Sequence, residues 1–183
     1  MANKKHIVRS TIIFDASNFY FKLKSLDVEH KSSFDYLKFS QWLTKGSRLA
    51  HKYYAVGKIE AIEGDEHSQK MMSRQQEIIA KLRKSGFTTQ YGYLLRTKDN
   101  KYHEKGVDVQ LAVDIMKGAY KNTYDICYLV SSDSDLIPAI KEAQSAGKKV
   151  IYVGFRHQVS YALHNQCKSH ILLSKSDLSQ FVK

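Results

Sequence analysis

The run Tyr124-Asp125-Ile126-Cys127-Tyr128-Leu129-Val130-Ser131 decides the fold, because it is nearly continuous in apolar side chains. Strands with this pattern are buried on both faces and occur in parallel sheets that helices cover. Apolar residues at helical spacing follow over 136–146, Gly147 supplies a stop, and another apolar run covers 149–155. This stretch predicts a strand, a helix and a second strand, the unit from which parallel sheets are built.

The same alternation extends towards both ends of the chain. Further strands are predicted over 9–15, 52–62, 87–95 and 171–173, and helices over 17–24, 33–45, 67–85, 106–120, 159–166 and 176–181. We therefore expect an α/β fold of the doubly wound type, with a mainly parallel sheet between helices. At 183 residues, the length suits a single domain spanning 1–183.

The charge balance favours a polyanionic partner. The chain has 29 Lys and Arg against 18 Asp and Glu, which gives a formal net charge of +11. Such an excess raises the expectation of nucleic acid, nucleotide or acidic membrane binding, although a solvated basic surface gives the same total.

Several classes of protein are disfavoured by composition. The longest nearly apolar run, 150–155, is too short to cross a bilayer, and the basic N-terminus lacks the long apolar region of a secretory signal. The two cysteines, Cys127 and Cys167, form no CxxC motif and suit a reducing compartment. We expect a soluble cytoplasmic protein without a membrane partner.

Acidic residues stand where the predicted strands end. Asp15 closes the first strand, and Asp133 and Asp135 follow the apolar run at 124–131. Asp108 lies in the first turn of the helix that precedes this run. If the first strand and the strand at 124–131 are neighbours, these carboxylates meet in one crevice beyond the carboxyl ends of the strands.

Carboxylates brought so close repel one another, and a hard divalent cation with oxygen ligands is their natural counterion. Mg²⁺ or Mn²⁺ in such a site orients water and neutralises charge on phosphate oxygens. Each acid taken alone has a simpler interpretation, because an Asp after a strand often caps a helix, as Asp135 before Leu136 can do. The set of four favours function over capping.

Three segments of the chain resemble the signature segments of the NYN domain, a branch of the PIN-like nuclease superfamily. They are Ile12-Ile13-Phe14-Asp15-Ala16-Ser17-Asn18-Phe19, Lys105-Gly106-Val107-Asp108-Val109-Gln110-Leu111-Ala112-Val113-Asp114 and Val130-Ser131-Ser132-Asp133-Ser134-Asp135-Leu136. Their order and spacing fit, and the resemblance is to the bacterial LabA-like, single-domain form.

This resemblance implies a PIN-like three-layer α/β/α sandwich and a metal-dependent ribonuclease that cuts RNA with a metal-activated water. Asp15, Asp108 and Asp133 would bind the metal, with Asp135 as the fourth acid. Asn18 would hold a water or phosphate, and Lys105 would approach the scissile phosphate. Asp114 also matches, but six residues place it about 120° around a helix from Asp108, so we expect it to support the site without ligating.

A basic segment leads into the proposed metal site. Between the strand at 87–95 and the helix at 106–120, the sequence carries cations with one aromatic residue among them: Arg96, Lys98, Lys101, Tyr102, His103 and Lys105. Charge on the backbone and stacking on the bases suit a single strand. We therefore expect this loop to contact single-stranded RNA. The oligomeric state is left open, a homodimer included.

Other sites and functions are less favoured. His164, Cys167 and His170 are spaced as zinc ligands, but the sequence offers no fourth ligand, and a partly buried Cys with surface His residues is the preferred interpretation. No P-loop or dinucleotide fingerprint is present. Two alternatives to a ribonuclease stay open: a non-catalytic RNA-binding or regulatory protein that keeps this fold, and a metal-dependent phosphatase.

Overall fold

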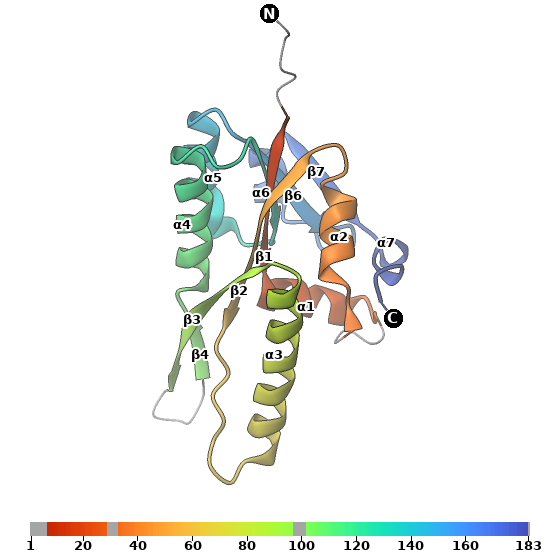
Figure 1. The fold of residues 1–183 in the computed structure, drawn as a ribbon, viewed down its shortest axis with the longest axis vertical. Helices are drawn as coiled ribbons and strands as arrows, with labels where there is room; N and C mark the ends of the chain where they lie inside the picture. The colour runs from red at the N-terminus through yellow and green to blue at the C-terminus, as the bar shows by residue number, and fades with distance from the viewer. Residues whose placement is uncertain (1–6, 29–32, 97–101, 183) are drawn as a thin grey trace, which may run out of the picture.

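A seven-stranded sheet with helices on both faces forms the structure, which is a computed structural model (Figure 1). It describes residues 7–28, 33–96 and 102–182, and only the backbone of 93–96 and 102–104. The strands are β1 (Arg9–Asp15), β2 (Arg48–Gly57), β3 (Thr88–Arg96), β4 (Tyr102–Lys105), β5 (Ile126–Val130), β6 (Lys149–Phe155) and β7 (Ser169–Leu173). The helices are α1 (Ala16–Ser25), α2 (Tyr36–Leu43), α3 (Glu66–Lys84), α4 (Val107–Tyr120), α5 (Ile137–Ser145), α6 (Tyr161–Gln166) and α7 (Lys175–Ser179), with a 3₁₀ turn η2 (Ser134–Leu136) before α5.

The strand order is β4-β3-β2-β1-β5-β6-β7. The strands from β3 to β7 in this order pair in parallel, and β4 pairs with β3 antiparallel. The chain leaves β1 towards β2 on one side, and β5 lies on the other side, so the topological switch point lies between β1 and β5. The predicted adjacency of the first strand and the strand at 124–131 is confirmed.

Alternate side chains of β1 face the two helical layers. Ile12 and Phe14 belong to a core shared with α1, α2, α3 and α7, whereas Ile13 packs in a second core with α4, α5 and α6. Both cores are fully enclosed at this strand, which is why the sequence of β1 is apolar on every residue from Ile12 to Phe14. The three-layer α/β/α architecture is confirmed.

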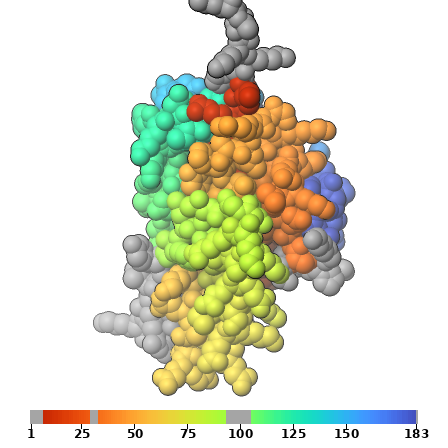
Figure 2. Space-filling model, viewed as in Figure 1, coloured from red at the N-terminus to blue at the C-terminus, as the bar shows by residue number. Residues whose placement is uncertain are grey.

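The strand predicted over 52–62 lies instead at 48–57. Its start moves because Arg48 pairs with Arg9 of β1. Its end moves because the side chain of Gln75 in α3 takes the hydrogen bonds that a strand neighbour would otherwise supply: Nε2 donates to the Gly57 carbonyl (2.7 Å), and Oε1 accepts from Ile59 N (2.9 Å). Beyond this point the chain and the first turns of α3 project from the body of the molecule (Figure 2).

The segment expected as a loop after the third strand contains the short strand β4. Its four residues form a hairpin edge on β3, with Tyr93 opposite Lys105. A strand this short and polar has no apolar alternation of its own, so the pairing with β3 decides its conformation.

Candidate metal and phosphate site

Asp15 ends β1 and begins α1. It has extended backbone angles (φ −80°, ψ 102°), and its Oδ1 accepts a hydrogen bond from Asn18 N (3.0 Å), which caps the helix. The residue is only 8% exposed. The pKa of Tyr54, in the aromatic core beside Asp15, is raised to about 12. Burial is the main cause of the rise; a hydrogen bond with Tyr36 opposes it, and the charge of Asp15 adds to it.

Ser131 links Asp15 to Asp133. The Ser131 hydroxyl donates to Asp15 Oδ2 (3.0 Å) and accepts from Asp133 N (3.1 Å). Ser131 is 2% exposed and follows β5 directly, so the link crosses the switch point between β1 and β5. Ser131 was not predicted as part of the site. The available signal was a small hydroxyl residue between a buried strand and an acid at a strand end.

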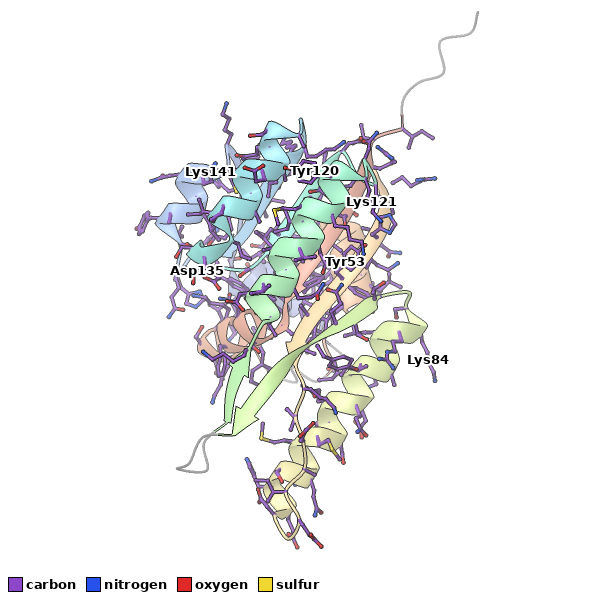
Figure 3. All side chains as sticks on the ribbon, turned by 90° about the vertical axis from the view of Figure 1, so that its left-hand side faces the viewer. Tyr53, Lys84, Tyr120, Lys121, Asp135 and Lys141 are labelled. Carbon is purple, nitrogen blue, oxygen red and sulfur yellow. The ribbon has the colours of Figure 1, made fainter. Side chains whose placement is uncertain are left out.

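Asp133 and Asp135 occupy the turn that leads into α5. Asp133 Oδ1 accepts from Asp135 N (2.9 Å) and so caps η2, which leaves Asp133 Oδ2 outside that bond. Asp133 is half-buried and Asp135 is exposed. Figure 3 shows Asp135 near the N-terminal end of α4, in agreement with the contact between α4 and η2.

Asp108 is exposed in the first turn of α4, and α4 begins at this same edge of the sheet. Gly92 of β3 allows this placement. A Cβ at position 92 would lie 2.5 Å from Val107 Cγ2 and 2.7 Å from the Lys105 carbonyl oxygen. Because both distances are shorter than van der Waals contact, the approach of α4 to β3 requires glycine there.

Replacing Gly92 with Ala is expected to lower the free energy of unfolding by about 1–3 kcal/mol, because the added methyl overlaps Val107 and the backbone at Lys105. Urea unfolding followed by circular dichroism measures the change. Thr88→Ala is the control, since Thr88 is exposed on the same strand and its loss is expected to cost within about 0.5 kcal/mol. Equal stability of the two variants would contradict this account of the contact.

The acids are not gathered around one point. Within the residues that the structure describes, no group of three or more His, Cys, Asp or Glu side chains is positioned to hold a metal ion. A hydrogen-bonded link brings Asp15 and Asp133 together, and Asp108 and Asp135 lie at the same edge. A shared metal site of Asp15, Asp108, Asp133 and Asp135 therefore stays a prediction.

The donor atoms at this edge nevertheless fit a hard cation. Two buried oxygens, Asn18 Oδ1 and Ser132 Oγ, have no hydrogen-bond partner. Each lies within three residues of Asp15 or Asp133. Buried oxygens without partners are costly, and a bound ion or its water would satisfy them. Carboxylate, amide and hydroxyl oxygens together are the ligand chemistry of Mg²⁺ and Mn²⁺.

Asp114 is a buried residue in the middle of α4, away from the strand ends. Its Oδ1 accepts from Gln110 Nε2 (3.3 Å), and its buried Oδ2 has no partner. Burial raises the pKa of Asp114, with hydrogen bonds from Gln90 and Gln110 opposing the rise. Tyr53 of β2, labelled beside α4 in Figure 3, has its pKa raised by burial and by the charge of Asp114. Asp114 is thus buried between α4 and the sheet, and its supporting role stays a prediction.

The predicted RNA-contacting segment lies on the β3–β4 hairpin. Arg96 ends β3, Tyr102 begins β4, and Lys105 ends β4 one residue before α4. Lys98 and Lys101 lie outside the described residues, and only the backbone is described at Arg96 and Tyr102. Lys105 is exposed at the edge that carries Asp108.

The zinc interpretation of His164, Cys167 and His170 stays disfavoured. The two imidazoles meet, with 3.2 Å between their Nε2 atoms, but Cys167 is fully buried. Burial raises the pKa of its thiol to about 11, which disfavours the thiolate that zinc requires.

Comparison with known proteins identifies the family. Residues 9–174 match the NYN domain. The chain belongs to the NYN domain family. This family is generally nuclease-like, which suggests RNA as a substrate, and nucleases of the NYN and PIN-like type typically use divalent metals. In this NYN chain, the acids Asp15, Asp108 and Asp133 of the candidate site all lie within the matched range.

Two similar proteins extend the comparison. A stretch of 59 residues is 41% identical to an uncharacterized protein from Methanocaldococcus jannaschii; it covers 32% of this NYN chain and 25% of that protein, so the match spans about a quarter of the relative. The crystal structure of a protein of unknown function from Vibrio parahaemolyticus is similar over 100% of both chains, with a TM-score of 0.72 and 21% identity. This second likeness shows the fold.

Among the described residues, the NYN chain has no helix that is both long and apolar enough to span a membrane.

Proposed function

We propose that this NYN protein is a metal-dependent ribonuclease that hydrolyses phosphodiester bonds of single-stranded RNA. The observation that carries the proposal is the Asp15–Ser131–Asp133 link at the switch point of the sheet, where open α/β sheets bind ligands. The buried Ser131 hydroxyl bonds the Asp15 carboxylate and the Asp133 backbone N–H, so it ties the two strand ends together. Two separate helix caps would not need this link, whereas a site that uses both acids needs their positions fixed relative to each other.

Asp15 and Asp133 would hold the cation, with Asp108 and Asp135 completing its ligands from α4 and η2. Bound Mg²⁺ or Mn²⁺ would supply a water of lowered pKa and positive charge beside the phosphate oxygens. Ser131 keeps Asp15 Oδ2 oriented by donating to it, and Asn18 N does the same for Oδ1. The Asn18 side chain offers an amide to hold a water or a phosphate oxygen.

Lys105 would attract the scissile phosphate as a point charge from the end of β4. Arg96, Lys98, Lys101 and Tyr102 would extend this contact along the RNA, with charge on the backbone and the Tyr102 ring on a base. The proposal also includes a LabA-like form, on the resemblance, a single domain over residues 1–183, on the length, and a cytoplasmic location, on the cysteine usage.

The proposal is tested by turnover of labelled RNA, labelled DNA and p-nitrophenyl phosphate, measured side by side with Mg²⁺, Mn²⁺ and EDTA. We expect cleavage of RNA that requires the metal and is lost in EDTA, because the acids repel phosphate unless a cation neutralises them. RNA that is bound but never cut would instead identify a non-catalytic RNA-binding protein. Preferential hydrolysis of the small ester would identify a phosphatase.

A further inference from the structure

Helix α1, which Asp15 caps, exposes two consecutive aromatic side chains. Ala16, Phe19 and Leu23 form its buried face, whereas Tyr20 is 49% exposed and Phe21 is 63% exposed. Single exposed aromatic residues are common and need no explanation. This pair does need an explanation, because it lies beside the candidate site.

The pair lies close to Asp15 along the helix. Five residues at 1.5 Å each separate Tyr20 from Asp15, which is about 8 Å along the helix axis. An RNA strand with one phosphate at Asp15 therefore has neighbouring nucleotides within reach of Tyr20 and Phe21. Ser17, one turn before Phe21, continues the same solvent-facing side of α1 back towards Asp15.

The two rings and a nearby cation form a surface suited to bases. The ring centroids of Tyr20 and Phe21 are 5.8 Å apart at an interplanar angle of 71°, an edge-to-face contact that steadies both rings. Lys24 is exposed one turn further on, on the side of Tyr20 and Phe21. Lys22 points elsewhere, since its Nζ donates to Gln158 Oε1 (2.7 Å). Aromatic faces beside a cation are the usual platform for single-stranded nucleic acid.

We propose that Tyr20 and Phe21 form a base-stacking platform that holds unpaired RNA bases beside the phosphate at Asp15. The proposal rests on the ribonuclease function above and adds a reason for strand selection. Bases in a duplex are already stacked and paired within it, whereas the unstacked bases of a single strand are free to stack on side chains. The platform on α1 is distinct from the β3–β4 hairpin, so the RNA would be contacted by two separate elements of the protein.

The test compares the wild-type chain with the double variant Tyr20→Ala/Phe21→Ala. Affinity is measured by fluorescence anisotropy with Ca²⁺, a hard cation with oxygen ligands that stands in for Mg²⁺ or Mn²⁺ at the acids, and gel electrophoresis checks that the RNA stays intact. The two probes are a single-stranded oligonucleotide and the same strand with consecutive abasic sites, which keeps its phosphates and loses its bases. We expect the double variant to bind the intact strand about tenfold more weakly and the abasic strand with wild-type affinity.

Tyr161→Ala is the matched control, because Tyr161 is 77% exposed on α6 and outside the proposed platform. We expect this variant to bind both probes as the wild type does. Alanine favours helix, so circular dichroism should show α1 intact in the double variant. Equal loss of affinity for intact and abasic strands would overturn the platform, since the pair would then act without bases.

The failure of this inference is distinguishable from failure of the ribonuclease function. Wild-type cleavage of RNA with unchanged binding in the double variant would overturn the platform and leave the function standing. Absence of metal-dependent RNA cleavage by the wild type would overturn the function on its own. A change in sedimentation of the double variant with unchanged RNA affinity would identify the pair as a protein contact and overturn the platform.

Discussion

Asp133→Asn is expected to reduce RNA cleavage at least about a hundredfold while the protein stays folded. The amide keeps an oxygen that can accept from Asp135 N, so the cap of η2 is retained. The Asp133 backbone N–H continues to donate to Ser131. What the variant removes is one negative charge and the second carboxylate oxygen at the proposed metal site. Initial rates on labelled single-stranded RNA with Mn²⁺ measure the effect.

A second measurement separates loss of metal binding from loss of folding. If the site binds Mn²⁺, the ion stabilises the folded state by mass action and raises the wild-type Tm. We expect Asp133→Asn to have nearly the wild-type Tm without the ion and a smaller rise with it. Asp35→Asn is the matched control, because Asp35 caps α2 by the same kind of bond, to Lys38 N (3.0 Å). Full cleavage activity in Asp133→Asn would refute the proposed site.

Phe14→Ala is expected to lower the free energy of unfolding by about 3–5 kcal/mol. Phe14 is fully buried, and five aromatic rings surround it, with centroids 5.5–6.4 Å away: Phe19, Tyr36, Phe39, Tyr54 and Phe87. These rings come from α1, α2, β2 and the residue before β3. A shift of any one of these elements would therefore not fill the cavity that Phe14→Ala leaves. Such a loss is a large share of the stability of an ordinary domain.

Equilibrium unfolding in guanidinium chloride measures the effect of Phe14→Ala, with the denaturant slope showing whether the same surface unfolds. Phe21→Ala is the control, because it deletes the same side chain from an exposed position and should change stability by within about 0.5 kcal/mol. A loss below about 1 kcal/mol for Phe14→Ala would mean that the core relaxes around the missing ring.

The strands with correctly predicted bounds are those whose own residues determine where the strand begins and ends. The strand at 9–15 and the strand at 149–155 have the predicted bounds, since their apolar runs are flanked by polar residues. The predictions for the segment of β4 and for the end of β2 were wrong, because the conformation of each depends on residues elsewhere in the chain. One depends on backbone pairing with β3, and the other on the distant side chain of Gln75.

The placement of the candidate residues was predictable to the level of the sheet edge. Strand ends identified Asp15 and Asp133, because parallel strands deliver their carboxyl ends to one edge. The bridging hydroxyl of Ser131 was not predictable, since its two bonds depend on the register between β1 and β5. The side-chain directions of Asp108 and Asp135 depend likewise on how α4 and η2 pack.

The Asp15–Ser131 bond joins residues separated by 116 positions, and β1 pairs with β5 across the same distance. The central strand of the sheet is thus made early and acquires one of its two neighbours late. During synthesis, the two acids of the proposed site cannot meet until the chain has emerged beyond Asp133. Under the proposed ribonuclease function, a nascent chain would therefore be unable to cut the messenger that encodes it until most of its own length has been translated.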